Sequence, residues 1–182
     1  MAPQFTDIVV DLETTGTDPS HSAVIEIGAV LFNYNTGEFG PTFNRCPDLL
    51  PMRFWDESTR EWWLNDKADL LESIYDRMEP AAVVWKDFAD FVAPYYGDLR
   101  FWSKPTSFDF PFVASHFRQL GIEMPFHFRI ARDLNSFIAA LGGSADHNPM
   151  RHVQTTGVAH SALDDCWHQL SMLMHAKAGI WA

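Results

Sequence analysis

Two acidic residues follow directly on an apolar run near the start of the sequence. In FTDIVVDLETTG the run ends at Val10, and Asp11 and Glu13 come next. Alternate residues of a β-strand point to the same face, so the two carboxylates can be presented together. Neighbouring negative charges in a partly desolvated place are unfavourable unless positive charge meets them. The stretch therefore indicates a site for cations, or else Asp11 caps a turn and Glu13 is merely exposed.

A second stretch, SFDFPF, places Asp109 between Phe108 and Phe110 at a predicted helix start. A carboxylate there can be a functional ligand, or it can simply cap the helix by accepting a hydrogen bond from a backbone N–H. The two phenylalanines flank this carboxylate, and core packing is expected for at least one of them.

The third stretch, HSALDD, joins a histidine to two acids at the start of the last predicted helix. Ser161 and Asp164 resemble a capping box, so Asp164 has a local structural role. Asp165 projects about 100° round the helix from Asp164 and belongs to a different face. His160 precedes the helix in a loop, where it can exchange protons with solvent, although a lone loop histidine can also be no more than solvated.

In this order, the three stretches resemble the three exonuclease motifs of the DnaQ-like superfamily, the DEDDh 3′→5′ exonucleases. DLETTG is similar to the first motif, SFDFPFV to the second and H-x-x-x-x-D to the third, and the resemblance covers about residues 5–178. It implies an α/β, RNase H-like fold, with a mixed β-sheet flanked by α-helices. The catalytic residues that it implies are Asp11, Glu13, Asp109, His160 and Asp165, and the four acids are the implied metal ligands.

Hydrolysis of a phosphodiester needs an activated water, relief of charge on the phosphoryl oxygens and a stabilised leaving oxygen. Two divalent ions about 3.5–4 Å apart can supply all three, and carboxylates suit Mg²⁺ or Mn²⁺. Four acids carry −4 and two ions carry +4, so the predicted site is near neutral before a phosphate enters. The resemblance makes His160 the general base, a role that the ordinary histidine pKa of about 6.5 suits.

Aromatic and polar residues near the motifs are candidates for substrate binding. Trp62 and Trp63 are adjacent on a predicted helix, so both cannot face the core; we expect one to pack and the other to lie near the groove, where it can stack on a base. Arg132 can contact phosphate or form a salt bridge at a helix start. The predicted substrate-binding residues are Thr14, Thr15, Trp62, Trp63, Phe108, Phe110 and Arg132, and further cations near the motifs are Arg60, Lys104 and Arg151.

The composition excludes some classes of protein. Asp and Glu number 24 against 13 Lys and Arg, a formal net charge of −11 that argues against binding nucleic acid through a broad basic surface. No apolar run approaches the roughly 20 residues that cross a bilayer, so we expect no membrane partner. The 182 residues predict a single exonuclease domain, 1–182, located in the cytoplasm, with Cys46 and Cys166 as reduced, partly buried thiols.

Hydrophobic patterns and turn residues predict an α/β or α+β order of elements. A capping box at Ser58 and Glu61 opens the first predicted helix, and Pro111 is placed in the first turn of the fourth. The strands are expected at 5–11, 23–33, 38–44 and 99–102, the helices at 58–63, 67–77, 83–95, 110–120, 133–141 and 161–177, and an irregular loop at 144–159.

The residues and the resemblance together predict a metal-dependent exonuclease that releases nucleoside 5′-monophosphates from single-stranded 3′ ends, and the 3′→5′ direction is implied by the resemblance alone. The tags STREWWLND and ARDL (131–134) resemble DexA-type exonucleases of phages and prophages and related bacterial exoribonucleases. DNA is therefore placed slightly ahead of RNA as the substrate. The alternatives are an exoribonuclease of the same family, a non-catalytic nucleic-acid-binding module and a metal-free hydrolase. The sequence leaves the oligomeric state open.

Overall fold

A mixed β-sheet forms the centre of the protein, as the sequence predicts. The computed structural model describes residues 4–95, 97, 99–145, 153–154 and 157–181. Its six strands lie in the order β4-β3-β2-β1-β5-β6, with β1–β2 and β2–β3 antiparallel and β1–β5 and β5–β6 parallel. The strands are β1 (Asp7–Thr14), β2 (Val24–Phe32), β3 (Phe39–Pro47), β4 (Met78–Glu79), β5 (Arg100–Ser103) and β6 (Ala131–Asp133).

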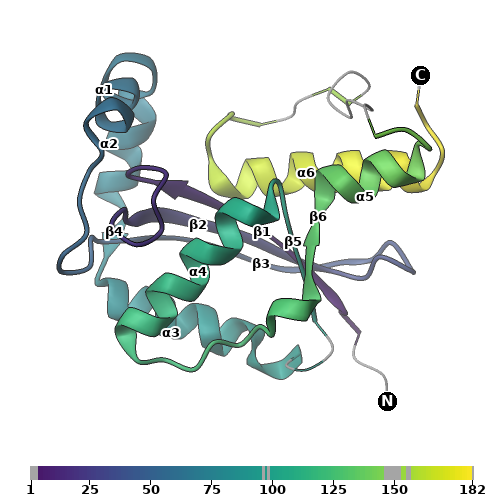
Figure 1. The fold of residues 1–182 in the computed structure, drawn as a ribbon, viewed down its shortest axis with the longest axis horizontal. Coiled ribbons are helices and arrows are strands. Elements are labelled where there is room, and N and C mark those ends of the chain that lie inside the picture. The colour runs from purple at the N-terminus through teal and green to yellow at the C-terminus, as the bar shows by residue number, and fades with distance from the viewer. Residues whose placement is uncertain (1–3, 96, 98, 146–152, 155–156, 182) are drawn as a thin grey trace.

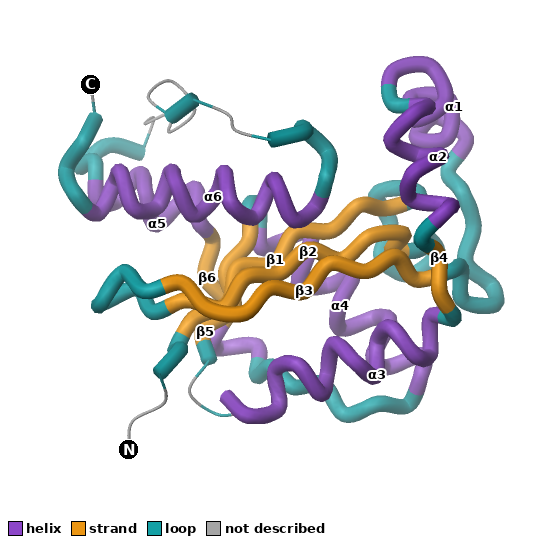
Figure 2. The backbone as a smooth tube through the Cα atoms, turned by 180° about the vertical axis from the view of Figure 1, so that it is seen from behind, coloured by secondary structure: helices purple, strands orange, loops and turns teal. Residues whose placement is uncertain are grey.

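Helices cover both faces of this sheet. Helices α3 and α4 lie on one face, α5 and α6 lie on the other, and α1 and α2 form a hairpin at one end (Figures 1 and 2). The helices are α1 (Glu57–Asp66), α2 (Ala68–Asp76), α3 (Ala81–Val92), α4 (Thr106–Leu120), α5 (Leu134–Leu141) and α6 (Ala162–Lys177), with 3₁₀ turns η1 (Ala93–Tyr95) and η2 (Phe128–Ile130). None of the helices in the described segments has the length and apolar character required to cross a bilayer.

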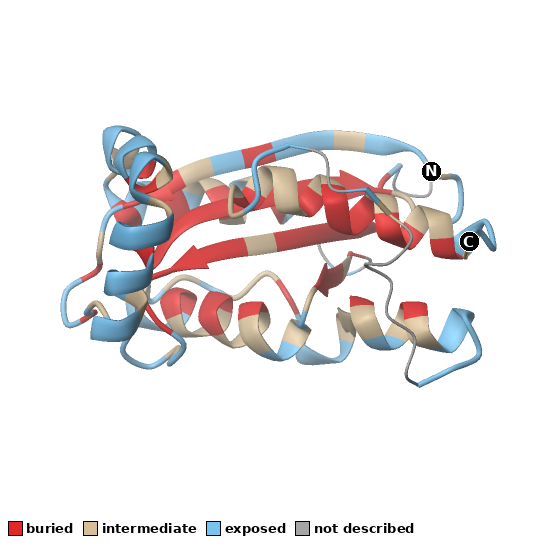
Figure 3. Ribbon diagram, turned by 90° about the horizontal axis from the view of Figure 1, so that it is seen from above, coloured by how far each residue is buried: buried red, intermediate tan, exposed pale blue. Residues whose placement is uncertain are grey.

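Burial on both faces explains why β1 and β2 read as continuous apolar runs rather than alternating ones. Every residue of β2 is buried, and Asp11 alone keeps partial exposure on β1 (Figure 3). Trp85 and Phe117 belong to the core between the sheet and α3–α4, whereas Leu134 and Leu170 belong to the core beneath α5–α6. The central strand is thereby held from both sides, which fixes the side chains at its end.

Helix boundaries differ from the prediction where capping was assigned to the wrong residue. Asp56, not Ser58, caps α1: its Oδ1 accepts hydrogen bonds from the Thr59 N–H at 3.0 Å and the Ser58 hydroxyl at 2.6 Å. The α4 helix begins at Thr106, four residues earlier than predicted, so Pro111 lies inside the helix rather than in its first turn. The missing N–H of proline then removes one bond of the helical ladder.

Two short strands were not predicted, because two or three residues carry no detectable period. β4 pairs with the end of β3, and β6 adds an edge strand next to β5. The helix expected from Asp133 begins at Leu134, and Asp133 caps it by accepting from the Ser136 N–H at 2.8 Å. Part of the loop expected at 144–159 lies outside the described residues.

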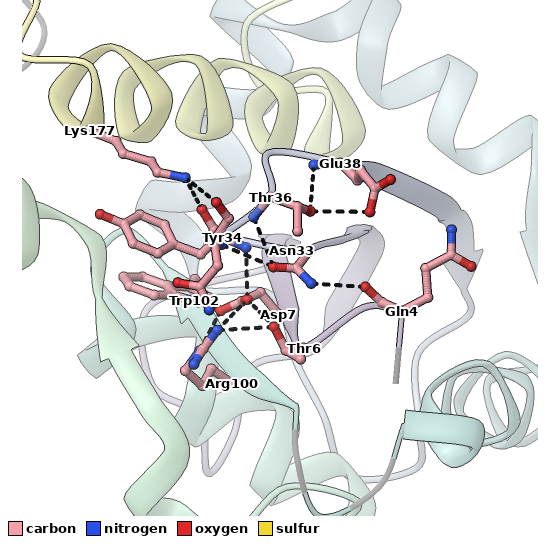
Figure 4. A network of polar contacts seen from close by, with 11 residues as sticks. Gln4, Thr6, Asp7, Asn33, Tyr34, Thr36, Glu38, Arg100, Trp102 and Lys177 are labelled. Atoms are coloured by element: carbon pink, nitrogen blue, oxygen red, sulfur yellow. Dashed lines mark hydrogen bonds and ion pairs between the residues drawn. The ribbon is translucent and has the colours of Figure 1, made fainter. Parts of the chain in front are cut away.

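The amino end of β1 carries a buried acid whose charge is fully matched (Figure 4). Asp7 is 0% exposed and accepts two hydrogen bonds from the Arg100 guanidinium, both at 2.6 Å. The Trp102 indole N–H and the Tyr34 backbone N–H also donate to it, at 2.8 and 3.0 Å. Burial raises the pKa of Asp7, but these bonds outweigh burial and lower it overall.

Candidate active site

The carboxyl end of β1 opens into a cavity of about 370 Å³ that gathers the predicted acids. Asp11 and Glu13 come from β1, Asp109 from the first turn of α4, and Asp165 from the first turn of α6. The cavity is lined by Asp11, Leu12, Glu13, Lys104, Phe108, Asp109, Ala159, His160, Asp165, His168 and Gln169. All five residues of the predicted catalytic set therefore meet in one place.

Close packing of α6 on β2 positions the third motif. A Cβ atom on Gly28 would lie 2.3 Å from the carbonyl carbon of Ala162, so only glycine allows the helix this near the strand. Glu26, 0% exposed on β2, accepts from the Ala162 N–H at 3.1 Å and from Arg77 at 2.9 Å. A strand carboxylate thus binds the helix N-terminus, where negative charge is favourable.

The capping box predicted at this helix does not form. Ser161 is the N-cap residue, but its side chain makes no capping hydrogen bond. Asp164 instead accepts from the Val158 N–H at 2.8 Å and so orders the loop that leads to His160. The prediction that Asp164 has a structural role is confirmed, although its partner is different.

Burial raises the pKa values of three carboxylates of the site, and neighbouring negative charges add to the effect at two of them. Burial raises the pKa of Asp11 well above its usual range, and the charges of Asp109 and Asp165 raise it further. Burial likewise raises the pKa of Glu13, with Asp11 as the next cause, and raises that of Asp109 to about 7. Among the described residues, the Asp11 carboxylate accepts one hydrogen bond, from Gln169 Nε2 at 2.7 Å. Such a group of acids is stabilised by bound cations.

The donor set fits hard divalent cations. Glu13, His160 and Asp165 each have a ligand atom within 4.8 Å of those of the other two, and Asp11 and Asp109 line the same cavity. Carboxylate oxygens are the ligands that Mg²⁺ and Mn²⁺ prefer. The residues present therefore match a divalent metal site of the kind that the sequence predicts.

His160 is held by its backbone and by an aromatic neighbour. The backbone φ of His160 is +69°, which lies in the left-handed region. This region is unfavourable for residues other than glycine. The His160 N–H donates to Asp165 Oδ2 at 2.9 Å, and its ring meets Trp62 edge to face at 4.9 Å. Burial, followed by the charge of Lys67, lowers the pKa of His160. The neutral ring, which can accept a proton, is therefore favoured.

The two tryptophans divide as their adjacent positions predict. Trp63 is 1% exposed, and its indole donates to the Thr14 carbonyl at 3.3 Å. Trp62 is 36% exposed and lies beside His160. Of the two phenylalanines, Phe108 lines the cavity, and Phe110 packs against Phe101 at 5.2 Å.

The remaining predicted substrate residues lie in different surroundings. The hydroxyls of Thr14 and Thr15 are buried and donate to the carbonyls of Gly16 and Phe54, at 2.8 and 2.7 Å. Arg132 lies on β6 and donates to the carbonyls of Arg129 and Ala131, and it is not among the cavity-lining residues. Of the further cations, Lys104 lines the cavity and Arg151 is outside the described residues.

Sequence reasoning did not find His168 and Gln169. They lie three and four positions after Asp165 on α6, a spacing that places them on the same helix face. Both line the cavity, and Lys104 is near enough to His168 for its charge to lower the histidine pKa, after the larger effect of burial. Their spacing from Asp165 was the available signal.

The model of one protein family, the 3′-5′ exoribonuclease Rv2179c-like domain, matches residues 6–176 of this sequence. The chain belongs to this family. The match takes in all three motifs and nearly all of the Rv2179c-like chain. The chain is accordingly a member of a family of 3′-5′ exonucleases. Comparison with curated proteins gives no match.

Solved structures share the fold of this Rv2179c-like chain. It superposes with a TM-score of 0.69 on cell-death related nuclease 4 (CRN-4), at 19% identity, over 97% of this chain and 65% of that one. The nuclease domain of 3′hExo, a DEDDh family member bound to rAMP, gives 0.60 at 16% identity, over 96% and 92%. Escherichia coli exonuclease I with a dT13 oligonucleotide gives 0.68 at 10% identity, over 96% and 41%. The chain thus spans less than two thirds of two of these proteins, and the likeness confirms the RNase H-like fold.

Proposed function

We propose that this chain is a metal-dependent 3′→5′ exonuclease that removes nucleoside 5′-monophosphates from single-stranded 3′ ends, with residues 1–182 acting as one exonuclease domain. The observation that carries the proposal is the meeting of Asp11, Glu13, Asp109 and Asp165 with His160 in one cavity, from three separate elements. The family match supports the direction of cleavage.

Each part of the site has a distinct task. The four carboxylates would hold two Mg²⁺ or Mn²⁺ ions, which supply charge relief to the phosphate and to the attacking and leaving oxygens. His160 takes the proton from the attacking water, and the Asp165 carboxylate, bound to the His160 N–H, fixes the backbone from which the ring projects. Trp62 limits the ring's orientation by edge-to-face contact.

Single-stranded RNA is our first choice of substrate, with DNA second. The support is the exoribonuclease description of the family, which reverses the slight preference for DNA in the sequence analysis. The structural neighbours were solved with both kinds of ligand, rAMP and dT13. A protein tells RNA from DNA by its contacts to the 2′-hydroxyl.

An end-labelled degradation assay tests the proposal. Single-stranded RNA and DNA of the same sequence, labelled at the 5′ or the 3′ end, are incubated with Mg²⁺, Mn²⁺ or EDTA and resolved on a denaturing gel. We expect a ladder from 5′-labelled RNA, immediate release of labelled monophosphate from 3′-labelled RNA, and no reaction in EDTA.

Isosteric variants serve as the matched controls. Asp11→Asn and Glu13→Gln keep the shape of the side chains and remove the charges that would hold metal, so both should abolish degradation. Degradation that continues in EDTA, or at the wild-type rate in both variants, contradicts the metal-dependent mechanism. A ladder from 3′-labelled substrate contradicts the direction.

A further inference from the structure

One wall of the cavity carries polar atoms that have no use in the proposed chemistry. His168 is 4% exposed, and among the described residues neither of its ring nitrogens has a hydrogen-bond partner. The Gln169 Oε1 atom is also buried and, among the described residues, also has no hydrogen-bond partner. Buried polar atoms are nearly always paired, and those that are not commonly await a ligand or water. Lys104 stands on the same wall and brings a positive charge.

This wall lies across β1 from the proposed general base. Lys104 directly follows β5, which pairs with β1 on one side. His160 precedes the end of α6 that packs on Gly28 of β2, the strand on the other side of β1. The carboxylates of β1 therefore separate His160 from Lys104.

The separation of His160 from Lys104 matches the geometry of the proposed reaction. In an in-line displacement the attacking and leaving oxygens lie on opposite sides of the phosphorus. If His160 activates the water, the leaving 3′-oxygen and the nucleotide attached to it are directed away from His160. In 3′→5′ cleavage that nucleotide is the next one of the shortened strand, and it carries its own phosphodiester.

We propose that Lys104 and His168 form a subsite for the phosphodiester one nucleotide upstream of the scissile bond. This inference rests on the proposed function and deepens it. An ammonium group and an imidazole N–H are both donors to phosphate oxygens, and imidazole has at least one N–H in either protonation state. In a chain of net charge −11, a local cation beside the acids also reduces the repulsion of this second phosphate.

The test combines a change in the substrate with a change in the protein. An oligonucleotide of the kind that the wild type degrades is made with an uncharged methylphosphonate at the second linkage from the 3′ end, and kcat and KM are measured for the first cleavage. In the wild type we expect the methylphosphonate to raise KM about tenfold, the usual effect of losing a hydrogen bond to a charged group. Lys104→Met and His168→Leu should raise KM for the normal oligonucleotide similarly, with kcat little changed, and should be insensitive to the methylphosphonate.

Two controls keep a structural effect apart from the proposed one. His175→Leu changes another histidine of α6 that does not line the cavity, and it should keep the full effect of the methylphosphonate. Lys104→Arg keeps the positive charge and should retain most of the effect of the methylphosphonate on KM. Mn²⁺ affinity, measured by calorimetry, should stay at the wild-type value in Lys104→Met and His168→Leu.

Several outcomes overturn the inference. If the methylphosphonate has an equal effect on the wild type and on both variants, the second phosphate does not bind at Lys104 and His168. A change in Mn²⁺ affinity that accounts for the change in activity means that Lys104 and His168 act on the carboxylate site and not on the second phosphate. If the wild type degrades neither RNA nor DNA, the proposed function itself fails, and this result is distinct from an active wild type whose variants respond to the methylphosphonate as strongly as the wild type does.

Discussion

Two aspartates on one strand show how the surroundings of a residue decide its role. Asp7, at the amino end of β1, is buried against Arg100 with its charge matched, and its pKa is lowered. Asp11, four residues later, faces other carboxylates, and its pKa is raised. A matched acid stabilises the fold, whereas an unmatched acid costs stability and is retained for what it binds.

Substitution of these two aspartates should shift stability in opposite directions. In EDTA at pH 8, Asp11→Asn removes repulsion and keeps an acceptor for Gln169, so we expect the free energy of unfolding to rise by about 1 kcal/mol or more. Asp7→Asn leaves Arg100 without its buried partner and should lower the free energy of unfolding by about 3–5 kcal/mol. Urea unfolding monitored by tryptophan fluorescence measures both. Destabilisation by Asp11→Asn would mean that the carboxylates do not repel one another.

Loss of the His160 side chain should remove turnover and keep the metal site. His160→Ala leaves the four carboxylates in place, so Mn²⁺ binding measured by calorimetry should persist while kcat falls about 10²–10⁴-fold, the usual contribution of a general base. His160→Gly should be equally inactive but more stable than the alanine variant by about 0.5–1 kcal/mol, since glycine adopts the left-handed φ without steric cost. Turnover within a few-fold of the wild type removes the assigned role.

At the scale of the elements, the site depends on how closely α6 approaches β2. The contact at Gly28 and the bond from Glu26 to the helix N-terminus set the height of Asp165 above the sheet. The hairpin of α1 and α2 adds the wall that carries Trp62, and Arg77, at the end of α2, binds the same Glu26 carboxylate.

A methyl group between β2 and α6 should displace the third motif. Gly28→Ala places a Cβ within 2.5 Å of backbone atoms of Ala162 and Leu163, and backbone cannot move aside cheaply. We expect a loss of about 1–3 kcal/mol in the free energy of unfolding and a loss of activity larger than the unfolded fraction explains. Ala29→Gly, the adjacent buried position, should cost about 0.5–1 kcal/mol and leave kcat unchanged. Wild-type kcat in folded Gly28→Ala would show that this contact does not position the acids.

Removal of the tryptophan beside His160, the proposed general base, should affect turnover more than binding. Trp62→Ala removes the ring against which His160 rests, so kcat should fall about tenfold, while Mn²⁺ affinity stays unchanged. Trp62→Phe should recover most of the turnover. Leu64→Ala, an exposed residue of the same helix, serves as the control for damage to α1. A rise in KM alone would assign Trp62 to the substrate instead.

The elements that bear the site could be predicted because their signals are local. The uninterrupted apolar run before Asp11 marks a strand buried on both faces, and the three motifs give the acids. His168 and Gln169 were missed because their importance arises only when α6 lies over β1. The cap at Asp56 was missed because several hydroxyl and acidic residues near α1 can cap equally well, and tertiary packing selects among them.

For the whole molecule, a buried neutral histidine links stability to pH. His116 Nε2 accepts from the Val24 N–H at 3.1 Å and Nδ1 bonds the Phe112 carbonyl at 2.8 Å, which fixes one neutral tautomer between β2 and α4. Burial, followed by the charge of Arg53, lowers the pKa of His116 to about 3. Protonation in the unfolded chain therefore competes with folding.

The contribution of His116 to stability should fall below neutral pH for this reason, whereas the site acids with raised pKa values change stability in the opposite direction. The folded pKa is depressed from an unfolded value of about 6.5, so the contribution of His116 is complete above pH 6.5 and is lost as pH falls towards 3. We expect a slope of about 1.4 kcal/mol per pH unit from this group between pH 6 and pH 4. His116→Gln, less stable at pH 8, should show a shallower slope in urea unfolding over that range. An unchanged slope would assign the pH dependence to other groups.

The hydrogen bond between the Glu26 carboxylate and the Ala162 N–H joins positions 136 residues apart. This separation has a consequence during synthesis of the chain. Asp11 and Glu13 are synthesised early. His160 and Asp165 can join them only after α6 has been synthesised and has packed against Gly28. Under the proposed function, a chain translated only through its middle therefore lacks part of the catalytic set and is inactive. The proposed activity therefore requires α6, the last helix of the described chain.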